Sequence, residues 1–161
     1  MKIAVFSDVH DHLVRWREAA EIIKSEEIKI GICCGDIGEL DTLNKVASSF
    51  DSVYLALGNL DYKISNKKGL FPENVKSSPD YGEIELDERK IAFAHRNSLA
   101  KQLTESEKYD IVFYGHTHTP WEEKIGDTVL LNPGEVAGHF GHATFAIYDL
   151  AKMKAELKIL K

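Results

Sequence analysis

The first part of the chain alternates between continuous apolar runs and segments with a helical repeat. Apolar runs of five or six residues predict buried strands at 2–7, 29–34 and 53–57. Between them, apolar side chains recur at spacings of three and four, which predicts helices over about 12–26 and 40–50. An order of strand, helix, strand, helix and strand is typical of a parallel sheet covered by helices.

The second half of the chain has a different pattern. A loop that contains Pro72 and Pro79 follows the third strand. Beyond this loop, apolar segments separated by short polar turns are typical of β-hairpins. We expect strands at 81–86, 90–94, 111–114, 143–148 and 155–160, a hairpin turn at Gly126–Asp127 and a weak helix at 97–107. Hairpins after a parallel start indicate a second, mixed sheet that packs on the first.

Composition changes this picture mainly by exclusion. With 161 residues, 43% of them hydrophobic, the chain is expected to fold as a single domain over residues 1–161 with a sizeable core. No apolar run approaches the ~20 residues of a membrane span, and the N-terminal run reaches Asp8 too early for a signal peptide. A net charge of −6 argues against a basic surface for nucleic acid. We therefore expect no membrane partner and no stable nucleic-acid binding.

The chain has two cysteines, Cys33 and Cys34, next to each other in an expected strand. Adjacent strand residues point to opposite faces, so these thiols are not expected to pair with each other. Unpaired cysteines favour a reducing compartment, and we expect a cytoplasmic protein.

Seven side chains of metal-binding types lie at five separate points, and each point follows an expected buried strand. They are Asp8, His10, Asp36, Asn59, His95, His116 and His118. In open α/β sheets, ligands bind beyond the carboxyl ends of the strands, so these five segments are expected to converge. Carboxylate and amide oxygens together with imidazoles suit a pair of divalent ions such as Mn²⁺, Ni²⁺, Fe²⁺, Co²⁺ or Zn²⁺. Two adjacent metal ions are a general device for hydrolysing phosphate esters.

Glycine precedes three of these residues directly, at Gly35, Gly58 and Gly115. Each one alone is as well explained as an ordinary loop glycine, but the threefold repetition favours a closely shaped metal site. Asp61 follows Asn59 by two positions. We expect Asp61 either to orient a ligand histidine or to be a plain turn residue.

The order of these motifs resembles that of the calcineurin-like metallophosphoesterases. D-x-H, GD, GN-x-D, H and GH-x-H follow one another across residues 8–118, as the five blocks of that family do. The small size and the segment NPGEVAG at 132–138 resemble its compact phosphodiesterase branch of bacterial and archaeal single-domain enzymes. The resemblance implies an α/β fold, a four-layer αββα sandwich of two mixed β-sheets flanked by helices, which agrees with the two sheets expected from the pattern.

The resemblance also implies a phosphoric diester hydrolase with two divalent metal ions, Mn²⁺ being the first choice. One ion would be held by Asp8, His10 and His118, the other by Asn59, His95 and His116, and Asp36 would bridge them. Asp36, Asn59 and His95 would then act in catalysis, in which a metal-bridging hydroxide attacks phosphorus in line with the leaving group. The implied substrate is a small phosphodiester, for example a cyclic or linear nucleotide.

One position departs from the family pattern. Most members have GNH where this chain has Gly58, Asn59 and Leu60, and that histidine is thought to assist the leaving group. His12, His139 and His142 are candidate replacements, although each is also explained as a surface or hydrogen-bonded histidine. We expect higher activity on activated diesters, such as aryl or 2′,3′-cyclic phosphates, than on poor leaving groups.

A second hypothesis retains the fold without strong catalysis. One subunit of the eukaryotic retromer coat resembles this branch and serves mainly as an interaction surface. Leu60 favours such a protein-interaction scaffold, whereas the complete set of seven ligands counts against it. A DNA-repair nuclease is disfavoured by the acidic charge. The oligomeric state stays open, and a homo-oligomer would be allowed by apolar edges of the second sheet.

Overall fold

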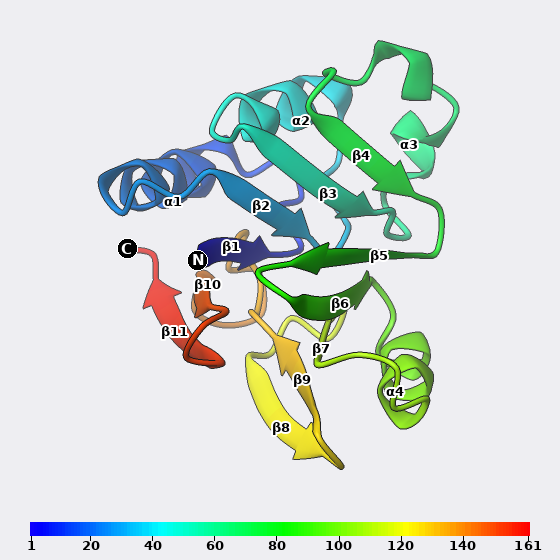
Figure 1. Ribbon diagram of the computed structural model, residues 1–161. Coiled ribbons are helices and arrows are strands. Elements are labelled where there is room, and N and C mark those ends of the chain that lie inside the picture. The colour runs from blue at the N-terminus through cyan, green and yellow to red at the C-terminus, as the bar shows by residue number, and fades with distance from the viewer.

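Two β-sheets pack against each other in the computed structural model, which describes residues 1–161 (Figure 1). The first sheet has six strands in the order β11-β10-β1-β2-β3-β4. They are β1 (Lys2–Phe6), β2 (Ile30–Cys33), β3 (Ser52–Ala56), β4 (Val75–Ser78), β10 (Thr144–Asp149) and β11 (Lys154–Ile159). Strands β1 to β4 run parallel, and β10 is antiparallel to both β1 and β11.

The second sheet has five strands in the order β5-β6-β7-β9-β8. They are β5 (Tyr81–Leu86), β6 (Arg89–Ala94), β7 (Ile111–Phe113), β8 (Trp121–Ile125) and β9 (Thr128–Asn132). The central strands β6, β7 and β9 are parallel, and antiparallel partners lie at both edges. Both sheets are therefore mixed, as expected.

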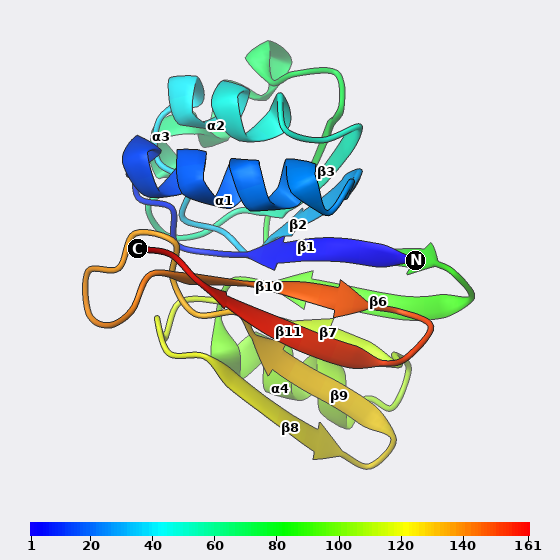
Figure 2. The same ribbon diagram turned by 90° about the vertical axis from the view of Figure 1, so that its left-hand side faces the viewer.

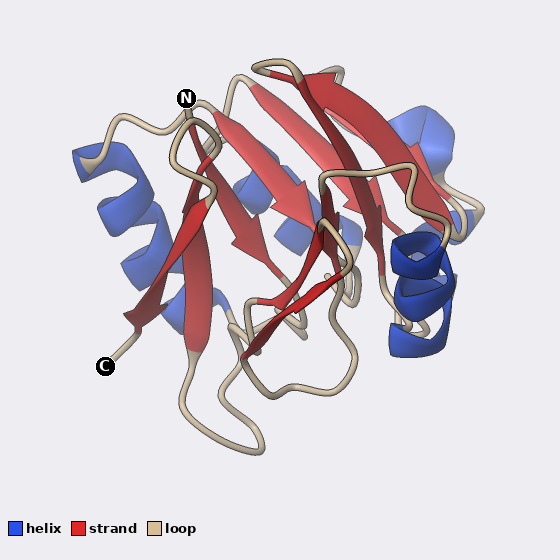
Figure 3. Cartoon of the chain, turned by 60° about the horizontal axis from the view of Figure 1, so that its bottom comes forward, coloured by secondary structure: helices blue, strands red, loops and turns tan.

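Helices cover the outer faces of the two sheets, as Figures 2 and 3 show. They are α1 (Leu13–Ser25), α2 (Leu40–Ala47), α3 (Tyr62–Ser65), α4 (Asn97–Glu105) and the short 3₁₀ helix η1 (Lys68–Leu70). Helices α1 and α2 lie over the first sheet, and α4 lies over the second (Figure 2). The expected four-layer αββα sandwich is confirmed. No helix is long and apolar enough to cross a membrane.

Strand β1 shows why the two sheets stack. Ala4 and Phe6 belong to the core under α1 and α2, whereas Ile3 and Val5 belong to the core between the sheets. Successive strand side chains point to opposite faces, so a strand covered on both sides is apolar at every position. A third core, between α4 and the second sheet, completes the four layers.

The segment after β3 differs from the expected loop. It contains α3, η1 and the strand β4, which pairs in parallel with β3 through Val53 and Val75. The sequence of β4, VKSS, has too few apolar residues to signal a strand, because an edge strand is only partly buried. The two late strands also join the first sheet beside β1 rather than the second.

Candidate metal centre

The structure brings all seven candidate residues together. They lie on the loops that follow β1, β2, β3, β6 and β7. Parallel strands carry their following loops at the same edge of a sheet, and the two sheets place these edges side by side. The donor atoms of Asp8, His10 and His118 lie within 4.8 Å of one another, and so do those of Asp8, Asp36 and His95.

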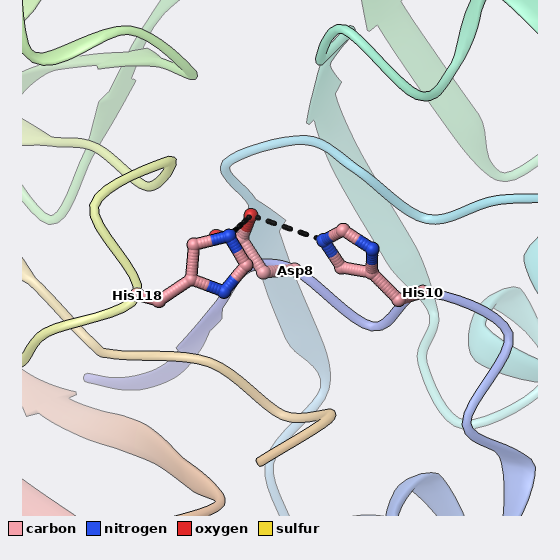
Figure 4. Close-up of side chains that lie close together, drawn as sticks. All are labelled: Asp8, His10 and His118. Atoms are coloured by element: carbon pink, nitrogen blue, oxygen red, sulfur yellow. Dashed lines mark hydrogen bonds and ion pairs between the residues drawn. The ribbon is translucent and has the colours of Figure 1, made fainter. Parts of the chain in front are cut away.

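The first group consists of Asp8, His10 and His118, whose side chains point toward one another in Figure 4. The Nε2 atoms of His10 and His118 each lie 3.4 Å from Oδ1 of Asp8. These distances are longer than an ordinary N–H···O hydrogen bond. Ligand atoms bound about 2.1 Å from one ion lie roughly 3.0 to 3.4 Å apart, so the spacing fits shared coordination.

Asp36 connects this group to a second one. Its Oδ2 lies 3.5 Å from Nε2 of His10 and 3.6 Å from Nε2 of His95. Its Oδ1 accepts the backbone N–H of Leu60 at 2.7 Å. Leu60, at the position where most of the family has histidine, therefore contributes its backbone to the site.

In the second group, Asn59 Oδ1 lies 2.9 Å from His95 Nε2 and 3.1 Å from His116 Nδ1. The two imidazole nitrogens are themselves 3.1 Å apart. His95 Nδ1 lies 2.8 Å from the carbonyl oxygen of Cys34, to which it can only donate. When such a ring is neutral, Nε2 has no proton, and its lone pair faces the lone pairs of Asn59 Oδ1. A cation between the two atoms would remove this repulsion.

Five of the seven residues have a left-handed backbone, which L-residues adopt rarely. They are Asp8 (φ 55°), His10 (φ 47°), Asp36 (φ 55°), His116 (φ 68°) and His118 (φ 60°). Non-glycine residues in this region cluster at functional sites, where the surrounding structure holds them against the strain. Of the eleven non-glycine residues with such a backbone in this chain, five are residues whose side chains converge here.

Two glycines are required by close approach within the site. A Cβ on Gly58 would overlap Oδ1 and the backbone nitrogen of Asp36. A Cβ on Gly115 would overlap the Ser7 hydroxyl and lie 2.9 Å from Oδ2 of Asp8. The repeated glycine before a candidate ligand thus reflects crowding, as expected for a closely shaped site.

Sequence reasoning did not single out Glu135, which orients His118. Glu135 is fully buried, and its Oε2 lies 2.7 Å from His118 Nδ1. A hydrogen bond at Nδ1 leaves the Nε2 lone pair of His118 directed at the first group. Burial opposes ionisation of Glu135, but hydrogen bonds from the Phe140 backbone and from His118 keep its pKa below the ordinary value. The available signal was an acidic residue within NPGEVAG, directly after β9.

Opposite effects set the protonation of Asp8, His10 and His116. Burial raises the pKa of Asp8, but the polar contact with His10 and the hydrogen bond from Ser7 outweigh it and leave the pKa lowered. The same contact with Asp8 raises the pKa of His10. Burial and the neighbouring His95 lower the pKa of His116. Asp8 and His116 are thus held in the forms that bind cations, whereas His10 would release a proton on metal binding.

Asp61 is a turn residue, as one of the two expectations had it, and its N–H bonds to the carbonyl oxygen of Gly58 at 3.2 Å. Its carboxylate accepts four backbone N–H groups, those of Asp36 (2.9 Å), Ile37 (2.8 Å), Gly38 (3.2 Å) and Gly58 (2.8 Å). These bonds join the loop after β2 to the loop after β3. Asp61 therefore does not orient a histidine; beyond its place in the turn, it holds the backbone that carries Asp36.

The three remaining histidines differ in position. His12 is the N-cap of α1, where its Nδ1 accepts the N–H of Arg15 at 3.3 Å. His139 is exposed, and its ring centroid lies 5.3 Å from that of His10. His142 is exposed at the end of the same loop. His139 is thus the one whose ring packs on a residue of the candidate centre.

Comparison with known proteins agrees with this geometry. Residues 1–153 match the sequence model of the calcineurin-like phosphoesterase superfamily domain. The chain belongs to this family. It is 33% identical to phosphodiesterase MJ0936 of Methanocaldococcus jannaschii, over 94% of this chain and 95% of that protein. It is 21% identical to phosphodiesterase YfcE of Escherichia coli K12, over 85% of this chain and 80% of that protein.

Solved structures show the same fold. An archaeal phosphodiesterase superposes with a TM-score of 0.85 at 30% identity, over 99% of this chain and 100% of the other. Vacuolar protein sorting 29 from Cryptosporidium parvum superposes with a TM-score of 0.71 at 21% identity, over 98% of this chain and 95% of the other. The second likeness is one of fold alone. Membership of the family implies divalent metal ions, and the Asp and His cluster supplies suitable donors.

Proposed function

We propose that this chain hydrolyses phosphodiesters at a centre that holds two divalent metal ions. The observation that carries the proposal is the contact of Asn59 Oδ1 and His95 Nε2 at 2.9 Å. Beside it, Oδ2 of Asp36 lies 3.6 Å from Nε2 of His95 and 3.5 Å from Nε2 of His10. Lone pairs converge where a cation would sit. The names of the relatives, phosphodiesterases MJ0936 and YfcE, support the choice of reaction.

The geometry supports the division of the ligands that the family resemblance implies. One ion would be held by Asp8, His10 and His118, the other by Asn59, His95 and His116, with Asp36 between them. Mixed nitrogen and oxygen donors accept several first-row metals, so Mn²⁺, Ni²⁺, Fe²⁺, Co²⁺ and Zn²⁺ are all candidates, with Mn²⁺ as the first choice.

Ions bound at this centre would supply positive charge for the phosphate oxygens and lower the pKa of a water molecule. Hydrogen bonds within the protein orient the carboxylates of the centre. Leu60 holds one oxygen of Asp36, so the other oxygen faces the centre. Ser7 is fully buried and donates to Asp8 Oδ2 at 2.6 Å, so its hydroxyl serves as a support for Asp8 rather than as a nucleophile.

The proposal is tested with protein stripped of metal by a chelator. Turnover of bis-p-nitrophenyl phosphate should be absent after stripping and should return when Mn²⁺ or Ni²⁺ is added, because the proposed attacking water needs bound ions to lower its pKa. Calcium serves as a control ion, since it favours all-oxygen sites over imidazole. Turnover that persists in the stripped protein would contradict the proposal.

Leu60→His should increase turnover of diesters with poor leaving groups. A histidine there would supply the proton donor that this chain lacks next to Asn59, whereas the backbone bond from residue 60 to Asp36 would remain. General acid catalysis is worth about 10²-fold or more when well placed, and about tenfold is expected from an unoptimised side chain. The ratio of rates on a dialkyl and a diaryl phosphodiester measures the effect, with Leu60→Gln as the size-matched control. An unchanged ratio would show that position 60 does not reach the leaving group.

The scaffold hypothesis remains the second candidate because of Leu60. It predicts two bound ions per chain without turnover of any diester. In that case a partner captured equally by the wild-type chain and by the Asp36→Asn variant would favour a binding role.

The compartment is part of the proposal. Cys33 and Cys34 are fully buried free thiols in the core, and burial raises the pKa of both. Neither is paired, which supports a reducing compartment such as the cytoplasm.

A further inference from the structure

The loop 138–142, between β9 and β10, packs against the candidate metal centre. In Figure 2 this loop lies on the left, at the end of the molecule toward which the arrow of β1 points. The Phe140 ring lies 4.9 Å from the His118 ring at an interplanar angle of 74°. The His139 ring lies 5.3 Å from the His10 ring at 69°. Two aromatic side chains of one loop thus each pack edge-on against a histidine of the first group.

Glu135 holds this loop in place. Its Oε1 accepts the backbone N–H groups of Phe140 at 2.6 Å and Gly141 at 3.0 Å, while its Oε2 bonds to His118. A fully buried carboxylate makes strong hydrogen bonds to such donors. One buried carboxylate therefore bonds both to the backbone of Phe140 and to the ring of His118.

Phe140 remains 81% exposed in spite of this anchoring. A single exposed apolar side chain is ordinary on a protein surface. Phe140 differs because its backbone is bound to the group that orients a candidate metal ligand, and its ring borders the centre. Its free ring surface is available to a molecule bound at that centre.

We propose that Phe140, together with His139, forms a subsite that stacks an aromatic group of the phosphodiester substrate, with Glu135 as its positioning residue. The substrate class is a nucleoside or aryl phosphodiester. This inference rests on the proposed function. Stacking on an aromatic side chain accepts any base, because every base has a π-face, so the subsite selects for an aromatic group rather than for a particular base.

Two substrates with the same leaving group test the subsite. They are the p-nitrophenyl ester of thymidine 5′-phosphate and methyl p-nitrophenyl phosphate. Phe140→Ala should raise KM for the thymidine ester roughly 5- to 30-fold and leave KM for the methyl ester within about twofold. Phe140→Tyr should restore the wild-type values. Leu70→Ala, which removes an exposed apolar side chain from η1, is the control and should change neither. Equal effects of Phe140→Ala on both substrates, or no effect, would overturn the proposal.

A binding measurement separates this inference from the proposed function. Saturation-transfer NMR on Zn²⁺-loaded protein compares adenosine 5′-monophosphate with ribose 5-phosphate. Base protons of the nucleotide should receive saturation from the wild-type chain and lose it with Phe140→Ala. If the wild-type chain hydrolyses neither ester, the proposed function fails, and this contact alone then decides for or against the subsite.

Two variants of Glu135 test the positioning role, with thermal melts to verify that each is folded. Glu135→Ala removes the acceptor of the loop amides, so hydrogen exchange at Phe140 and Gly141 should accelerate, and the KM ratio of the two esters should fall toward that of Phe140→Ala. Glu135→Gln retains an oxygen acceptor and should keep both the protection and the ratio. Protection and ratio unchanged in Glu135→Ala would show that Glu135 does not position the subsite.

Discussion

Replacing Asp36 with asparagine should reduce metal-dependent hydrolysis of bis-p-nitrophenyl phosphate by about 10³-fold or more. The Oδ2 atom of Asp36 lies between the two groups, 3.5 Å from His10 Nε2 and 3.6 Å from His95 Nε2. A carboxylate there would offset the repulsion between the two cations of the proposed centre. The isosteric amide has no charge, so several kcal/mol of transition-state stabilisation would be lost. Each 1.36 kcal/mol lost lowers the rate about tenfold.

The substitution retains the shape of the site. An asparagine can still accept the Leu60 N–H with its oxygen, so the loop has no reason to rearrange. The number of metal ions bound per chain, measured by inductively coupled plasma mass spectrometry, should fall below the wild-type value together with the rate. Asp41→Asn is the matched control, because Asp41 is an exposed carboxylate at the start of α2, and its rate should stay within about twofold of wild type. A rate for Asp36→Asn within about tenfold of wild type would show that Asp36 does not bridge the ions.

Asp61→Ala should lower the free energy of unfolding by about 3 to 5 kcal/mol. The carboxylate of Asp61 accepts four backbone N–H groups, at residues 36, 37, 38 and 58, and alanine would leave them without an acceptor in the interior. An unpaired buried donor costs about 1 to 3 kcal/mol, less where water can enter. Urea denaturation measures the change, and an unchanged slope would confirm that the same surface is exposed on unfolding.

The control for this stability prediction is Asp41→Ala. Asp41 pairs with Lys45 on the exposed side of α2, where an ion pair contributes about 1 kcal/mol or less. A loss below about 1 kcal/mol for Asp61→Ala as well would indicate that water replaces the carboxylate at these amides. Weaker metal binding by Asp61→Ala is also expected, since Asp61 supports the backbone on either side of the centre.

Much of the fold could be predicted because apolar periodicity is a local property. The continuous apolar run of β1 and the spacing of three and four in α1 reflect which faces are buried, and the structure places both as expected. Strand β4 escaped prediction because a half-exposed edge strand needs few apolar residues. The placement of β10 beside β1 escaped because the partner of a strand depends on pairing between distant segments, which an apolar pattern does not specify.

The candidate site divides in the same way. The sequence by itself determined the family and the two sheets and indicated the seven candidate residues, because strand ends followed by glycine and a metal-binding side chain can be recognised one segment at a time. Only the tertiary structure revealed that Glu135 holds both His118 and the loop 138–142, and that Asp61 clamps two loops. These roles depend on hydrogen bonds between segments far apart in the chain. Such bonds depend on which buried donors and acceptors come together in the folded chain, and a local sequence pattern carries no information about that.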